Sequence, residues 1–138
     1  IIYRANRYDI KGKEVLKSLE KYYVADTGLK NTIMGYTLEN YGHSIENVVY
    51  LELLRRGYKV YIGKCNNKEI NFIAINKEET CYFQVTESLK DSNTCEREIS
   101  PFYLTNDFYE KTIITTDKTY VTNIKGIKIV NLIDFLLS

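Results

Sequence analysis

The chain has 138 residues, a mass of 16.2 kDa and a formal net charge of +1. This length suits one domain with a buried core, and the near-neutral charge gives no overall attraction to nucleic acid, although it is compatible with a local basic patch. No apolar run approaches the ~20 residues of a membrane-spanning helix, and no signal-peptide pattern opens the chain. Three cysteines without CxxC spacing indicate reduced thiols, so we expect a cytoplasmic protein.

The first predicted elements are short. A basic helix is predicted at residues 13–20, where three apolar side chains have helical spacing. Residues 22–24 are typical of a short strand, and residues 29–34 of a helical turn that ends at Gly35.

The clearest helix is predicted at residues 44–56. Ser44 would accept hydrogen bonds from free amides at its start, and Gly57 would end it. By the 3.6-residue period, Glu46 shares a face with apolar residues. The helix therefore presents one acid among core-facing neighbours.

The remaining pattern alternates strands and helices. Three strands are predicted at residues 58–63, 69–75 and 80–86. A helix follows at about 91–104, with Pro101 as a kink or stop. Strands at 111–116 and 127–130 precede a last helix, which Asn131 or Asp134 would start and which ends at residue 137. This order predicts an α/β fold with a mixed β-sheet flanked by helices.

Five polar residues form a candidate site. Glu69 and Asn71 are spaced i, i+2 on one strand, and Gln84 and Thr86 on the next, so each pair is expected on one face. Together with Glu46 they have the layout of a hydrolytic Mg²⁺ site, where carboxylates hold the ion and a lysine activates water. Asn and Gln keep an oxygen but lose the charge, and Thr cannot supply a lysine's positive charge.

This layout resembles the PD-(D/E)xK restriction-endonuclease-like superfamily, and the resemblance implies a restriction-endonuclease-like sheet. Asn71 stands where the superfamily has its aspartate, Gln84 at the (D/E) position and Thr86 at the lysine position. The resemblance makes Glu46, Glu69, Asn71, Gln84 and Thr86 a remnant catalytic site, with Glu46 and Asn71 as candidate metal ligands.

Nearly the whole chain also resembles the uncharacterised C-terminal domain of prokaryotic AAA+-type ATP-binding proteins. The similarity is carried by RYDIKGK at 7–13, KYYVADTGL at 21–29, residues 46–58, KEINF at 68–72, residues 94–98 and NLIDFLL at 131–137. It implies an ATPase module as partner, since this chain has no G-x-x-x-x-G-K-[ST] phosphate loop. Residues 1–30 would lead from that module, and residues 31–138 would form the nuclease-like domain.

Three functions follow as hypotheses. The first is a non-catalytic, nuclease-like accessory or interaction domain of an ATP-binding protein, needing no cofactor. The second is a Mg²⁺-dependent DNA nuclease with a variant site, and the third a nucleic-acid-binding module without cleavage. Lys64, Arg55 and Arg56 are candidate phosphate contacts for DNA, with solvated or dipole-stabilising roles as the alternative. A homo-oligomer is compatible with all three, and a membrane partner is not expected.

Overall fold

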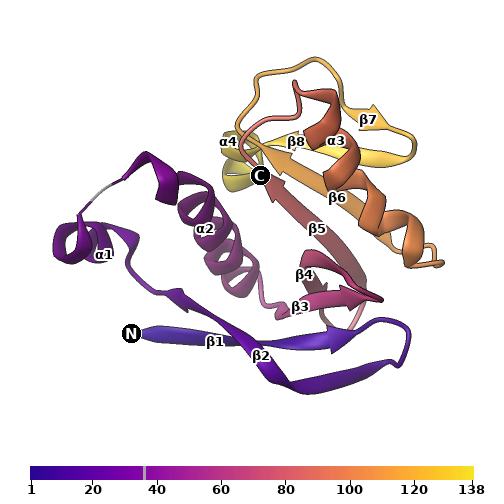
Figure 1. The fold of residues 1–138 in the computed structure, drawn as a ribbon, viewed down its shortest axis with the longest axis horizontal. Helices are drawn as coiled ribbons and strands as arrows, with labels where there is room; N and C mark the ends of the chain where they lie inside the picture. Colours follow the sequence, from indigo (N-terminus) through magenta and orange to yellow (C-terminus); the bar gives the residue numbers. More distant parts are fainter. Residues whose placement is uncertain (36) are drawn as a thin grey trace.

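An eight-stranded mixed sheet with helices on both faces forms the molecule (Figure 1). A computed structural model describes residues 1–35 and 37–138, apart from the side chain of Glu39. The strand order is β2-β1-β3-β4-β5-β6-β8-β7. The predicted mixed sheet flanked by helices is therefore confirmed at this level of detail.

The strands and helices of the described chain have the following bounds. The strands are β1 (Ile2–Asp9), β2 (Glu14–Val24), β3 (Lys59–Cys65), β4 (Lys68–Ile75), β5 (Thr80–Thr86), β6 (Glu110–Thr115), β7 (Asn123–Ile124) and β8 (Ile127–Asn131). The helices are α1 (Thr27–Met34), α2 (Tyr41–Arg55), α3 (Ser92–Ile99) and α4 (Leu132–Leu137), with 3₁₀ turns η1 (Leu38–Asn40) and η2 (Ser100–Leu104). None of these described helices is both long enough and apolar enough to cross a membrane.

The N-terminal hairpin corrects the predicted helix at residues 13–20. These residues belong to β2, which pairs antiparallel with β1 from Ile2↔Val24 to Asp9↔Glu14. A bulge interrupts the pairing near Leu19, whose φ is +57°. The apolar spacing of a short segment does not distinguish helix from strand, and here the pairing with β1 decides. Residues 1–30 thus contribute two strands to the same sheet as the rest of the chain.

Helix α2 begins earlier than predicted. It starts at Tyr41, and Ser44 is not its cap, because its hydroxyl donates to the carbonyl of Asn40 within the first turn at 3.0 Å. The predicted apolar face is confirmed, since Val49 and Leu53 are fully buried.

The predicted helix at 91–104 is two elements. α3 ends at Ile99, and η2 follows with Pro101 in its first turn, where a missing backbone N–H is tolerated. Asp91 caps α3 by accepting a hydrogen bond from the Asn93 amide at 2.9 Å. The strands predicted after residue 57 and the last helix are found within a few residues of their expected bounds. The strand predicted at 22–24 is the end of the longer β2, and β1 and β7 were not predicted.

Two hydrophobic layers enclose the sheet. One lies between the sheet and the helices α2 and α4, and includes Tyr50, Phe72 and Phe135. The other lies under α3 and η2 and includes Ile99 and Phe102. Figure 1 shows the β1–β2 hairpin at one edge of the sheet, at a distance from α3. Helix α2 contacts this edge, since Glu46 and Asn47 form hydrogen bonds with the end of β2.

Candidate functional site

A bulge at the start of β4 shapes the candidate site. Tyr61 pairs with Ile73 and Gly63 with Ile70, so Asn71 and Phe72 together lie opposite Ile62. An extra residue in one strand breaks the two-residue alternation. The bulge therefore interrupts the alternation from which a common face for Glu69 and Asn71 was predicted. The Glu69 side chain bonds Arg7 and Lys21, and the Asn71 side chain bonds the Val85 amide.

Asn71 and Gln84 tie β4 to β5 through their side-chain amides. The regular ladder ends at Phe72↔Phe83. Beyond it the backbone N–H of Asn71 donates to Gln84 Oε1 at 2.7 Å, and the backbone N–H of Val85 donates to Asn71 Oδ1 at 2.8 Å. Gln84 Nε2 then donates to the Glu98 carbonyl at 3.2 Å. Both amides thus serve as links between backbone segments.

Glu69 faces the hairpin and is held by two cations. Arg7 Nη1 lies 2.6 Å from one carboxylate oxygen and Lys21 Nζ 2.5 Å from the other. Burial opposes ionisation of Glu69, but the hydrogen bonds from Lys21 and Arg7 outweigh it and lower its pKa. The carboxylate is therefore ionised and neutralised by the protein itself.

Glu46 joins the same network from α2. Its Oε1 accepts a hydrogen bond from the Tyr23 hydroxyl at 2.5 Å and lies 3.6 Å from Lys21 Nζ. Tyr23 is buried against Tyr50, and this burial, with the adjacent Glu46 charge, raises the Tyr23 pKa far above its usual value. We call Arg7, Lys21, Glu46 and Glu69 the Lys21 cluster.

A small hollow of about 300 Å³ opens beside these residues. Glu69, Asn71 and Gln84 line it together with Glu98 of α3. Burial raises the pKa of Glu98. The positive charge of Arg97 lowers this pKa, and the negative charge of Glu46 raises it further. Glu46 itself does not line the hollow, but its negative charge contributes to the raised pKa of Glu98.

The donor set does not fit a Mg²⁺ ion. Magnesium takes oxygen ligands that are free to point at the ion, usually including one or two carboxylates. Here the Glu69 carboxylate is paired with two cations, and Asn71 Oδ1 and Gln84 Oε1 accept backbone hydrogen bonds. Among residues 1–35 and 37–138, no three His, Cys, Asp or Glu side chains gather closely enough to hold a metal ion.

Thr86 and Lys64 lie at the margins of this arrangement. Thr86 is half-buried, its hydroxyl donates weakly to the Ser88 carbonyl at 3.4 Å, and it does not line the hollow. Lys64 is exposed on β3, opposite Glu69 in the β3–β4 ladder. Of the residues predicted for the site, Glu69, Asn71 and Gln84 are the three that line one hollow.

Arg55 and Arg56 belong to a separate cluster at the other end of α2. Both bind Glu52, at 2.6 Å and 2.9 Å, and their hydrogen bonds lower the Glu52 pKa to about 2. Arg56 also donates to the Phe135 carbonyl at 2.5 Å and lies over that ring. Nine residues separate Arg55 from Glu46, which is about 14 Å along a helix. We call Glu52, Arg55 and Arg56 the Glu52 cluster.

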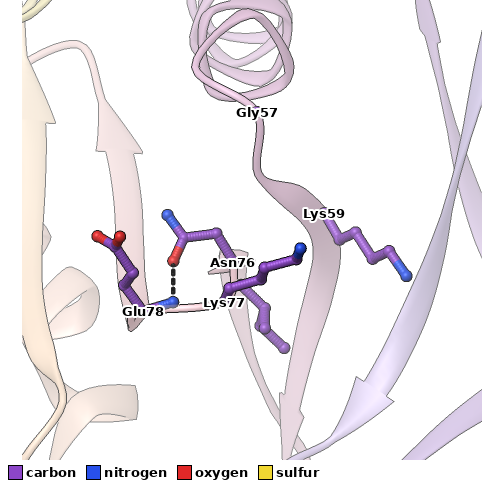
Figure 2. A pocket seen from close by; sticks show the side chains of 6 residues that line it. Gly57, Lys59, Asn76, Lys77 and Glu78 are labelled. Atoms are coloured by element: carbon purple, nitrogen blue, oxygen red, sulfur yellow. Dashed lines mark hydrogen bonds between the residues drawn. The ribbon is translucent and has the colours of Figure 1, made fainter.

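A larger depression, of about 660 Å³, lies at the opposite end of β4. Figure 2 shows Lys59, Asn76, Lys77 and Glu78 around it, near Gly57. Asn76 Oδ1 accepts hydrogen bonds from the amides of Glu78 and Glu79, which fixes the β4–β5 turn. These are the contacts of a turn, and none of the predicted site residues lines the depression.

Three members of the observed site were not predicted: Arg7, Lys21 and Glu98. Arg7 and Lys21 come from the hairpin, 62 and 48 residues before Glu69. Because a helix was wrongly predicted at 13–20, the strand alternation that places Lys21 and Tyr23 on one face was not recognised. Glu98 had no distinguishing pattern, because it lies among other charged residues of α3.

The chain is similar to two longer proteins. It is 39% identical over 137 residues to an uncharacterized protein of Haemophilus influenzae, covering 99% of this chain and 34% of the relative. It is 32% identical over 106 residues to an uncharacterized protein of Methanocaldococcus jannaschii, covering 74% of this chain and 23% of the relative. The chain thus spans about a third or less of these relatives. No family model and no solved structure matches it significantly.

Proposed function

We propose that this domain is a non-catalytic, restriction-endonuclease-like interaction domain of a longer prokaryotic ATP-binding protein. In a nuclease of this class the acidic groups of the two middle strands hold a metal ion. Here their counterparts maintain the fold, and the domain acts by binding the rest of its own polypeptide.

The observation that carries this proposal is the position of the Lys21 ammonium. It lies 2.5 Å from Glu69 and 3.6 Å from Glu46, so a side chain supplies the positive charge between the two acids. Displacing it would require breaking the ion pairs and leaving a half-buried ammonium without a partner, which is costly. The side-chain oxygens of Asn71 and Gln84 accept backbone hydrogen bonds, so these two oxygens are also not free to bind a metal ion.

An apolar surface beside the N-terminus supports the interaction role. Helix α1 has no buried residue, and its apolar side chains Leu29, Ile33 and Met34 are exposed next to Ile1 and Ile2. These residues line a groove of about 380 Å³. Exposed apolar surface of this kind marks contact sites, and relatives about three times as long would have further chain to cover it.

Metal binding tests the non-catalytic part. Titration calorimetry with Mn²⁺ is expected to give no saturable heat for this chain. The double variant Lys21→Met with Asn71→Asp removes the internal cation and adds a carboxylate, so it should bind Mn²⁺ measurably. The full-length protein should leave plasmid and single-stranded DNA intact with Mg²⁺, with or without ATP. Saturable Mn²⁺ binding that Glu46→Ala abolishes, together with DNA cleavage, would show a nuclease instead.

Amide hydrogen exchange tests the interaction part. Residues 27–34 are expected to exchange quickly in this chain alone, because α1 lacks buried contacts, and at least about tenfold more slowly in the full-length protein. The amides of β5 provide the control and should be protected in both. Equal exchange of residues 27–34 in both proteins would contradict the proposed contact.

A further inference from the structure

Three exposed aromatic rings line another hollow, at the opposite end of η2 from Asn71. Ser100 and Pro101 line the hollow near Asn71, whereas Tyr103 lines a second one of about 630 Å³. Phe108 and Tyr109 line this second hollow too. Phe108 is fully exposed, and about half of Tyr103 and of Tyr109 is exposed. We call it the aromatic hollow.

The turn that presents Phe108 is held firmly. Asp107 Oδ1 accepts hydrogen bonds from the Tyr109 amide and from Lys111 Nζ, both at 3.1 Å, and Asp107 Oδ2 accepts one from the Tyr82 hydroxyl at 2.7 Å. Lys111 also donates to the carbonyls of Asp107 and Tyr109. These hydrogen bonds fix the turn that carries the exposed Phe108 ring. Ligand binding therefore costs the protein little backbone conformational entropy at this turn.

Positive charge accompanies the rings. Three lysines line the aromatic hollow, against two carboxylates, Asp107 and Glu110. Lys125 Nζ lies 5.9 Å from the centroid of the Tyr103 ring, and within the described ranges no acidic side chain pairs with it. Lys128 pairs with Glu110 at 2.8 Å, but more than half of its side chain is exposed. The hollow thus combines flat apolar faces with a net positive charge.

We propose that the aromatic hollow binds single-stranded nucleic acid. Unpaired bases stack on exposed aromatic rings, and neighbouring lysines contact the phosphates, a combination that tolerates any sequence. Phe108 and Tyr103 would stack bases, and Lys125 and Lys128 would contact the backbone. In a duplex the base faces are stacked on one another, so a duplex would gain only the electrostatic attraction between its phosphates and the lysines. A proline-rich peptide would pack on the rings but would not use the positive charge.

Fluorescence anisotropy with labelled oligodeoxythymidylate of about 15 nucleotides tests this, because such a strand covers one binding module. Phe108→Ala is expected to weaken binding by about 5- to 150-fold, the range for loss of one stacked base. Lys125→Ala should reduce the dependence of affinity on salt by about 0.7 in the log–log slope. Tyr22→Ala, which removes an exposed tyrosine from β2, is the matched control and should bind like the parent.

Phe108 is fully exposed, so its replacement should leave the thermal midpoint within about 2–4 °C of the parent. Failure of the parent chain to bind the strand in roughly 50 mM salt, where phosphate contacts are strongest, would overturn the proposal. Binding that Phe108→Ala leaves unchanged, or equal binding of duplex, would overturn it as well. Binding of a polyproline peptide in place of the strand would assign the hollow to peptides.

Discussion

Helix α2 carries a charged cluster at each end, and the two are built differently. The Glu52 cluster joins residues three and four positions apart on one helix turn. The Lys21 cluster joins α2, β1, β2 and β4, over separations of up to 62 residues. A local cluster steadies the end of a helix, whereas a long-range one fixes how the hairpin meets the sheet. Only the latter contains residues of the predicted site, Glu46 and Glu69.

Replacing Lys21 is expected to have the largest effect. Lys21→Met leaves Glu46 close to Glu69 with less positive charge, and we expect a loss of about 2–3 kcal/mol in the free energy of unfolding. This is below the 3–5 kcal/mol for a fully buried pair, because about a third of the Lys21 side chain is exposed. Urea denaturation measures it. Lys17→Met, an exposed neighbour on β2, should change stability by less than about 0.5 kcal/mol; equal losses would refute a special role for Lys21.

Glu69→Gln should cost about 1–2 kcal/mol at pH 7, since it leaves Arg7 and Lys21 without their shared partner. The folded protein lowers the pKa of Glu69 below its usual value of 4.5. Its contribution is therefore fully present above about pH 4.5 and is lost as the pH falls through the folded pKa. Urea midpoints between pH 7 and 3 should show that the variant lacks this part of the acid sensitivity, while Glu78→Gln in the exposed β4–β5 turn retains it.

Glu52→Gln provides the local counterpart and should cost about 0.5–1 kcal/mol at pH 7. Glu52 itself is buried, but Arg55 is largely exposed and Arg56 keeps its hydrogen bond to the Phe135 carbonyl, so neither cation is left buried without a partner. The pKa of Glu52 is lowered to about 2, so its stabilising effect falls away between about pH 4.5 and 2. Thermal melts across that range check the window. A cost larger than that of Glu69→Gln would reverse the ranking of the two clusters.

Glu98→Gln is expected to have the smallest effect and the opposite sign. Burial raises the Glu98 pKa, so the ionised carboxylate destabilises the folded protein at neutral pH, and this cost disappears as the pH falls toward the usual carboxyl value. The variant should be more stable than the parent by about 0.5 kcal/mol at pH 8 and equal to it near pH 4. Glu96→Gln, at an exposed position of α3, should show no such pH-dependent gain.

The same contrast explains what could be predicted from the sequence. β5 was predicted with its observed bounds, and α4 within a residue or two, because β-branched runs and a capping asparagine are local signals. The β1–β2 hairpin was not predicted, because the apolar spacing of residues 13–20 is compatible with both helix and strand. Only the pairing with β1 makes this segment a strand. For the site, Glu69, Asn71 and Gln84 line one hollow, although a bulge in β4 interrupts the regular alternation on which the prediction depended. The bulge that separates Glu69 from Asn71, and the cations from the hairpin, depend on distant pairings that no short pattern encodes.

The place of β1, between β2 and β3, affects how the polypeptide can be shortened. β1 runs parallel to β3 through residues Arg7 to Asp9. A truncation that removes residues 1–30 would delete both cations of the Lys21 cluster and expose the edge of β3 that β1 covers, while the other edge stays paired with β4. An uncovered strand of this kind recruits strands from other molecules, so the shortened protein should precipitate or exchange segments between copies. The first two strands therefore protect the rest of the sheet from self-association.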